Sequence, residues 1–175
     1  MTHTAANSKP FRAVFQGASD LNELKKAYHA LARQHHPDCG GSDAEMKAIN
    51  TAYETRFEEL KQAHNAKAAQ DTSGRTCATT EAPREFIEII SLLLRLDGLR
   101  VELCGSWLWI SGNTRSHKDA LKAAGCRWAP KKGMWNWHHA EDGSPHYRGS
   151  ASMAQIRSKY GSEIFRATQR EELPA

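Results

Sequence analysis

The first candidate for a functional site is the tripeptide His36-Pro37-Asp38, which is followed by Gly40-Gly41. Proline interrupts a helix and paired glycines disfavour its continuation, so these residues predict a tight, exposed loop between two helices. The tip of such a loop lies farthest from the core, so packing is least able to explain its residue types. Pro and Asp are also ordinary turn residues, so an unspecialised turn is the alternative.

The second candidate is the stretch of residues 115–137, in which six basic residues stand against one acid and tryptophans lie between them. Basic groups attract phosphates and indole rings stack on unpaired bases, which is typical of single-strand nucleic-acid binding. Alternatively, the tryptophans form the core of a small domain, because Trp135 and Trp137 would share one face of a strand. The candidate nucleic-acid-binding residues are Arg115, Lys118, Lys122, Arg127, Trp128, Lys131, Lys132 and Trp135.

Other chemistries have little support. The four cysteines include no C-x-x-C pair, which predicts reduced thiols and no zinc site. The adjacent pair His138-His139, with His146, is poorly arranged to hold one metal ion. The sequence has no recognisable phosphate-binding loop, nucleophile elbow or paired carboxylates near a histidine. We therefore expect no enzymatic activity, no metal and no cofactor.

Composition indicates a folded protein without a membrane partner. The chain has 175 residues, 39% of them hydrophobic and 25% charged, with a net charge of +4. Its longest apolar run, residues 86–96, is too short for a bilayer core of roughly 30 Å. Residues 1–10 are small and polar and predict no export leader, so we expect a cytoplasmic protein.

Residues 10–63 carry two helical patterns. Apolar residues spaced by three and four predict helices over residues 21–35 and 44–63, capped by Ser19 or Asp20 and by Ser42 or Asp43. The two apolar faces would bury each other as a helical hairpin, with a short segment around Phe11, Val14 and Phe15 across its open side. The predicted faces are Leu21, Leu24, Tyr28, Leu31 and His35, and Met46, Ile49, Tyr53, Phe57 and Leu60. Four basic residues lie off the first face and are expected to be exposed: Lys25, Lys26, His29 and Arg33.

The rest of the chain predicts a second, different module. Residues 64–84 lack large apolar side chains and predict a flexible linker. Residues 85–150 predict a small α+β domain, a helix followed by ββαββ with Trp-rich hairpins, in which Ser116 and Asp119 form a capping box. Residues 151–175 predict a terminal helix and tail. The expected fold class is α+β in two modules, an all-α hairpin and a small sheet domain.

The compound pattern KKAYHALARQHHPDCGG followed by MKAINTAYETRF resembles a J-domain, the module of DnaJ-type co-chaperones. The resemblance covers residues 11–60. It implies a DnaK-type ATPase as partner, whose ATP hydrolysis the chain would accelerate while hydrolysing nothing itself. It also implies that Asp38 meets an arginine of the partner and that Asn50 makes a structural polar tie to the loop or a neighbouring turn. The implied chaperone-binding residues are His36, Pro37, Asp38, Lys25, Lys26 and Arg33.

The chain departs from the J-domain pattern in ways that matter. His29-Ala30 and Gln34 stand where basic residues are frequent, so electrostatic steering should be weaker. The first helix is short and the charged fourth helix is expected to be missing. The segments LDGLRVELCGSWLWISGNT and KDALKAAGCRWAPKKGMWNWH resemble a module fused to J-domains in uncharacterised proteins of bacterial genomes and mobile elements. That resemblance implies no ligand.

Two functions follow as expectations. In the first, a co-chaperone stimulates a DnaK-type ATPase and its C-terminal domain selects an unfolded client or a location. In the second, the C-terminal domain is a nucleic-acid-binding module of a plasmid or phage, and the J-domain recruits the host chaperone to a nucleoprotein complex. They differ in whether the C-terminal domain binds nucleic acid.

Overall fold

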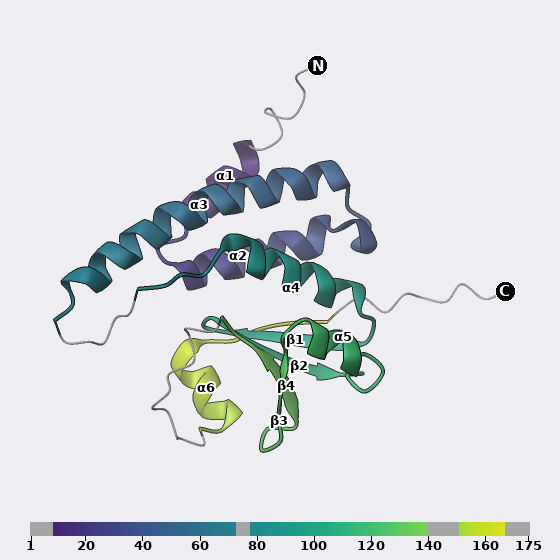
Figure 1. The fold of residues 1–175 in the computed structure, drawn as a ribbon. Helices are drawn as coiled ribbons and strands as arrows, with labels where there is room; N and C mark the ends of the chain where they lie inside the picture. The colour runs from purple at the N-terminus through teal and green to yellow at the C-terminus, as the bar shows by residue number, and fades with distance from the viewer. Residues whose placement is uncertain (1–8, 73–77, 140–150, 167–175) are drawn as a thin grey trace. The chain divides into compact units, whose positions relative to one another are not determined.

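The computed structural model describes residues 9–72, 78–139 and 151–166, which form two compact units, residues 1–91 and 92–175 (Figure 1). Helices make up the described part of the first unit, and an antiparallel five-stranded sheet with helices makes up the second. The predicted α+β class with two modules is confirmed. None of the helices within the described ranges could span a lipid bilayer.

The first unit is built on the predicted hairpin of α2 (Leu21–His35) and α3 (Asp43–Gln70), with α1 (Lys9–Gln16) packed mainly on α3. Both predicted caps are confirmed, because Asp20 accepts a hydrogen bond from the Glu23 amide and Ser42 accepts one from the Glu45 amide. The core of the hairpin is aromatic. Tyr53 lies at its centre, with ring centroids 4.4 Å from Tyr28, 5.7 Å from Phe57 and 6.0 Å from Phe15.

The buried face of α2 is wider than its apolar pattern predicts. Leu24 and Tyr28 are buried as expected, whereas Leu21 and Leu31 are only partly buried. Two polar residues, Lys25 and His29, are buried instead, so their predicted exposure is wrong. A second segment of the chain covers this side of α2, which the spacing of apolar residues within α2 alone cannot reveal.

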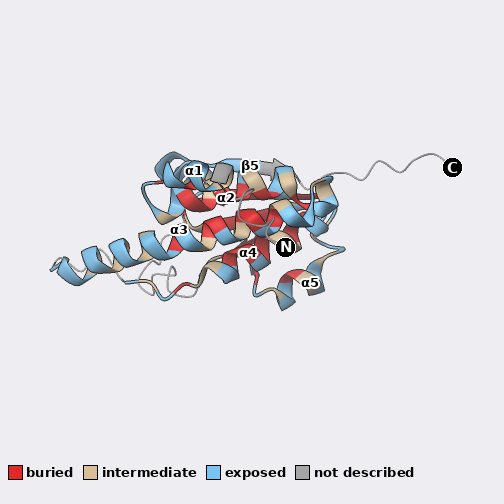
Figure 2. Cartoon of the chain, turned by 90° about the horizontal axis from the view of Figure 1, so that it is seen from above, coloured by how far each residue is buried: buried red, intermediate tan, exposed pale blue. Residues whose placement is uncertain are grey.

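That covering segment lies inside the range predicted as a linker and at the start of α4 (Pro83–Arg95). Helix α3 continues to Gln70 instead of ending near residue 63, because the added residues are rich in alanine, the strongest helix former. The later turns of α3 are largely exposed in Figure 2. Residues 79–81 then hydrogen-bond back to this part of α3.

The division between the two units falls within α4, after Ser91. The sequence assigned this whole helix to the C-terminal domain. The structure places its first turns in the N-terminal unit, where Phe86 is fully buried with its ring centroid 6.0 Å from that of Tyr28 and 6.2 Å from that of Tyr53. The first turns of the predicted helix therefore pack on the hairpin.

The second unit contains a sheet of order β3-β4-β2-β1-β5. Both predicted hairpins are present, β1 (Leu99–Cys104) with β2 (Trp107–Gly112) and β3 (Arg127–Ala129) with β4 (Met134–Trp137). Strand β4 also pairs with β2, so Val101, Ile110 and Trp135 lie side by side on one apolar face. Short α5 (Lys118–Ala123) joins the hairpins and buries Leu121.

Two features of the second unit differ from the prediction. The capping box at Ser116 is wrong, since α5 begins after His117 without a side-chain cap. The terminal helix α6 (Met153–Tyr160) is present, with a capping box from Ser152 to Gln155, and leads into β5 (Glu163–Arg166). Strand β5 pairs with β1 and completes the sheet, so residues 151–166 belong to this unit and do not trail from it.

An ion pair between exposed Arg157 and buried Glu102 joins α6 to the sheet. Glu102 of β1 accepts hydrogen bonds from Arg157 at 2.5 and 2.7 Å. Those bonds lower the pKa of the Glu102 carboxyl against the opposing effect of burial. Removing Arg157 would cost stability, because the Glu102 charge would stay buried without its partner.

Candidate functional site

The His36-Pro37-Asp38 loop is a tight turn built on the end of α2. The His36 amide still bonds the Ala32 carbonyl at 2.8 Å, and Pro37–Cys39 then form a single 3-10 turn, η1. The His36 carbonyl accepts from the amides of Cys39 and Gly41, each at 2.9 Å. This backbone network fixes the turn.

Gly41 sets how closely the loop approaches α2. A Cβ atom at this position would lie 2.0 Å from the carbonyl oxygen of His35, so no other residue fits. Gly40 has a φ of +92°, in the left-handed region that favours glycine. The Gly-Gly pair is therefore required by the shape of the loop.

His36 is buried, with 4% of its surface exposed, although the sequence predicts an exposed loop. Its Nδ1 atom accepts a hydrogen bond from the Asp38 amide at 3.2 Å and lies 3.5 Å from Asp38 Oδ2. As an acceptor, Nδ1 carries no proton. His36 therefore holds the loop and fixes the backbone position of Asp38.

The neighbouring His35 secures the base of the loop from the other side. Its ring lies edge-on to Phe11 of α1, with centroids 5.2 Å apart, and its Nδ1 lies 3.2 Å from Glu45 Oε2. The pKa of Glu45 is lowered by its contacts with His35 and Ser42. Helices α1, α2 and α3 thus all contribute to positioning the tripeptide.

Asp38 and Pro37 are the exposed part of the tripeptide. The Asp38 side chain is 50% exposed. A carboxylate in this position can form a charge-assisted hydrogen bond with a guanidinium group of another protein. Arg33 is exposed and Lys26 partly exposed on α2, so both remain accessible to an acidic surface. Lys25 is not accessible, because it is buried against Glu81.

Asn50 makes a polar tie, but not to the loop or to a neighbouring turn. Its Oδ1 atom accepts a hydrogen bond from the Tyr28 hydroxyl at 3.0 Å, which joins α3 to α2. Burial raises the pKa of Tyr28 well above its ordinary value, so this hydroxyl keeps its proton and its role as donor. The predicted partner of Asn50 was therefore wrong. Asn50 instead forms a hydrogen bond between two helices.

We expect His29→Gln to reduce the loss of stability that acid causes. Burial first, and the nearby charge of Arg33 second, lower the pKa of His29 to about 3 from an ordinary 6.5. Below pH 6.5, His29 therefore binds a proton in the unfolded chain but not in the folded chain. The stability contributed by neutral His29 is complete above that pH and falls by about 1.4 kcal/mol per unit as the pH drops toward 3.

Urea unfolding followed by circular dichroism at 222 nm, between about pH 7.5 and 5, would measure this effect. The variant should show a shallower fall in the free energy of unfolding than the unmodified chain. His117→Gln, a partly exposed histidine of the second unit, is the matched control and should leave the slope unchanged. Equal slopes for His29→Gln and the unmodified chain would contradict the assignment.

The second candidate site is not brought together as predicted. Trp135 and Trp137 are buried on the apolar face of the sheet, so they serve the core. Trp128, on edge strand β3, is 47% exposed, with its ring edge-on to Trp135 at 5.7 Å. The predicted cations Arg115, Lys118, Lys122, Arg127 and Lys131 are exposed, and Lys132 is partly exposed.

Lys132 lies beside a group of aromatic residues that was not predicted from the sequence. Its Nζ lies 5.1 Å from the ring centroid of Trp109, which stacks on Trp107, and Trp107 in turn stacks on His138 at 3.9 Å. Trp107 and Trp109 lie on the sheet face opposite Trp135. The alternation W-x-W in residues 107–109 was the available signal.

Metal-ligating residues do not cluster in the described ranges, where no group of three or more His, Cys, Asp or Glu could hold an ion. His138 Nδ1 lies 2.7 Å from the carbonyl oxygen of His139, and His146 lies outside the described residues. Burial raises the pKa of the Cys126 thiol to about 12.

Curated relatives match the N-terminal region of the chain, whereas no family model and no solved structure matches it. The chain is 48% identical over 54 residues to the chaperone protein DnaJ of Acetivibrio thermocellus, which covers 29% of this chain and 14% of that protein. It is 52% identical over 46 residues to DnaJ of Rickettsia bellii, covering 23% and 12%. It is 34% identical over 59 residues to the small t antigen of BK polyomavirus, covering 34% of each.

These alignments span between 12% and 34% of the relatives they match. They agree with the N-terminal fold, in which two helices carry the His36-Pro37-Asp38 loop at their junction. The N-terminal region of this chain is therefore similar in sequence to DnaJ chaperone proteins and to a small t antigen, which supports the predicted resemblance to a J-domain.

Proposed function

We propose that the chain is a co-chaperone that accelerates ATP hydrolysis by a DnaK-type chaperone. The observation that supports this most directly is the loop itself, in which a buried His36 holds a half-exposed Asp38 carboxylate at the tip of the J-domain hairpin. The chain needs no catalytic residue of its own, because the ATP is hydrolysed in the partner.

The proposed mechanism uses the two exposed parts of the site for different tasks. Arg33 and Lys26 of α2 attract an acidic surface, which mainly speeds encounter and sets orientation. Asp38 then pairs with an arginine of the chaperone, an interaction that is strong because both groups are charged and the loop is already ordered. Stabilising the chaperone conformation that hydrolyses ATP would shift its population toward that conformation.

The test is a single-turnover ATPase measurement with a bacterial DnaK-type chaperone and increasing amounts of the full chain. A saturable increase in the hydrolysis rate is expected, and it should weaken as salt rises because α2 contributes screened charge. A rate that stays at the basal value at every concentration of a folded chain would refute the proposal.

For the C-terminal unit we propose selection of a client or a location as the main role. Nucleic-acid binding is the second candidate, and one observation favours it. Trp128 exposes half of its surface on a short edge strand, and exposed Arg127 and Lys131 lie close by in the sequence. An exposed indole beside cations can stack on an unpaired base while the cations contact phosphates.

Fluorescence anisotropy with single-stranded DNA and RNA over a salt series separates the two roles. The full chain should be used, because a cut at residue 85 would remove Phe86 from the N-terminal unit. Binding that weakens with salt, and that is lost in Trp128→Ala and in the double variant Lys131→Glu/Lys132→Glu, would support a nucleoprotein role. Absence of binding at low salt would favour a role of the C-terminal unit in selecting protein clients.

A further inference from the structure

One basic residue of α2 is withdrawn from the surface that a chaperone would meet. Lys25 is 1% exposed, its Nζ lies 2.7 Å from Glu81 Oε2, and its ammonium sits 5.4 Å from the ring centroid of Phe86. Glu81 is equally inaccessible, at 2%. A buried ammonium is unfavourable unless an opposite charge accompanies it, so the burial of Lys25 depends on the segment that supplies Glu81.

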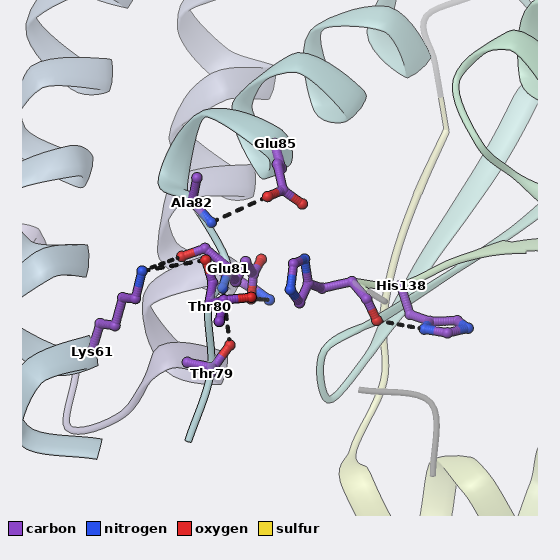
Figure 3. A network of polar contacts seen from close by, with 9 residues as sticks. Lys61, Thr79, Thr80, Glu81, Ala82, Glu85 and His138 are labelled. Carbon is purple, nitrogen blue, oxygen red and sulfur yellow. Dashed lines mark hydrogen bonds and ion pairs between the residues drawn. The ribbon is translucent and has the colours of Figure 1, made fainter. Parts of the chain in front are cut away.

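That segment, residues 78–91, is held by specific contacts as well as by this ion pair. Lys61 Nζ donates to the carbonyl oxygens of Glu81 at 2.8 Å and Thr80 at 3.4 Å (Figure 3). Asn65 makes two hydrogen bonds with the backbone of Thr79, at 2.8 and 3.1 Å. Both Lys61 and Asn65 belong to the later part of α3, beyond its last core residue.

The apolar half of the same contact comes from the first turns of α4. Pro83 opens the helix, and the Ala82 amide donates to Glu85 Oε1 at 3.3 Å, which caps it (Figure 3). Phe86 then packs on Tyr28 and Tyr53 with no exposed surface. Phe86 and Glu81 together cover the side of α2 that carries Lys25 and Tyr28.

We propose that residues 78–91 form an intramolecular cover that limits chaperone binding by the J-domain. Glu81 forms the ion pair with Lys25 that an acidic group of the partner would otherwise form. Complete binding of the partner to α2 therefore requires the cover to dissociate from α2. The inference rests on the proposed function, and it adds that the form of the chain described here is the less active one. Arg33, Lys26 and Asp38 remain accessible for the first encounter.

The Glu81–Lys25 pair offers a way to open the cover without touching the loop. Glu81→Gln removes the carboxylate and leaves the Lys25 ammonium buried without its counter-charge, which favours release of the segment and hydration of Lys25. Glu88→Gln makes the same change of charge at an exposed position of α4 and is the matched control. Phe86→Ala weakens the apolar half of the contact and is the second opening variant.

The first experiment measures the cover itself. The full chain is treated briefly with an amine-acetylating reagent, and the extent of modification at Lys25 and at its partly exposed neighbour Lys26 is read by mass spectrometry. Lys25 should react about tenfold more slowly than Lys26, and Glu81→Gln or Phe86→Ala should remove most of that difference. Equal reactivity in the unmodified chain, or protection that survives both substitutions, would overturn the proposal.

The second experiment measures the consequence. At a subsaturating concentration, Glu81→Gln should stimulate the chaperone's ATPase severalfold more than the unmodified chain, and Glu88→Gln should equal the unmodified chain, since a cover closed about 90% of the time lowers apparent affinity about tenfold. If Glu81→Gln exposes Lys25 and stimulation does not rise, the cover is structural only and the proposal is wrong. If no form stimulates at all, the proposed function fails, while the acetylation result still decides whether the cover exists.

Discussion

Asp38→Asn is expected to abolish stimulation of a DnaK-type ATPase while leaving the J-domain folded. The substitution removes the charge that we propose meets an arginine of the chaperone, and truncating one partner of a buried charge pair typically costs about 2–5 kcal/mol of binding. That loss corresponds to a fall of at least about 30-fold in affinity. The Asp38 amide bond to His36 Nδ1 does not depend on the side chain, so the loop should keep its shape.

The measurement compares single-turnover ATPase rates across a concentration series, with circular dichroism as a check on folding. Asp43→Asn, an exposed acid in the first turn of α3, makes the same change of charge close by and should retain full stimulation. His36→Gln is a less clean test than the exposed aspartate, since His36 is buried and holds the turn. Full stimulation by Asp38→Asn would show that the loop does not act through its carboxylate.

Tyr53→Ala is expected to unfold the N-terminal unit or to lower its stability by about 3–5 kcal/mol, the usual result of truncating a large buried aromatic residue. Tyr53 has no exposed surface and its ring contacts four other aromatic rings, from α1, α2, α3 and α4. The cavity would therefore open at the point where every helix of the unit meets.

Urea unfolding gives separate signals for the two units. All five tryptophans follow residue 92, so their fluorescence reports the second unit, whereas helical ellipticity at 222 nm reports mainly the first. Tyr53→Ala should shift the ellipticity transition to lower urea. Tyr160→Ala, at a half-exposed tyrosine of α6, should change stability by less than about 0.5 kcal/mol. An ellipticity transition unchanged by Tyr53→Ala would mean that Tyr53 is not the centre of the core.

The parts of the fold that could be predicted are those set by local signals. Helical spacing, caps and the loop of residues 37–41 each depend on residues a few positions apart, and α2, the start of α3 and the loop formed where these signals placed them. In the second unit the Gly-bounded alternation of β-prone residues predicted both hairpins for the same reason. One local signal that failed was the cap at Ser116, whose hydroxyl bonds Asn113 instead.

The parts that could not be predicted depend on contacts between distant residues. Lys25 and Glu81 are 56 positions apart, and nothing in the α2 sequence indicates that its lysine will be buried. Strand β5 is short, and only its pairing with β1 makes it a strand. Each interpretation of the Trp-rich stretch fits part of it, since Trp135 is buried in the core and Trp128 is exposed.

Gly41 has a consequence for how substitutions in this loop would be tolerated. Every other amino acid carries the Cβ that would collide with His35, so each missense change at Gly41 should reduce the amount of folded protein in a cell. Changes at Asp38, three positions earlier and half-exposed, should leave abundance intact and remove only activity. Measuring abundance and activity together across all substitutions would therefore separate the residues that shape the loop from the residue that acts through it.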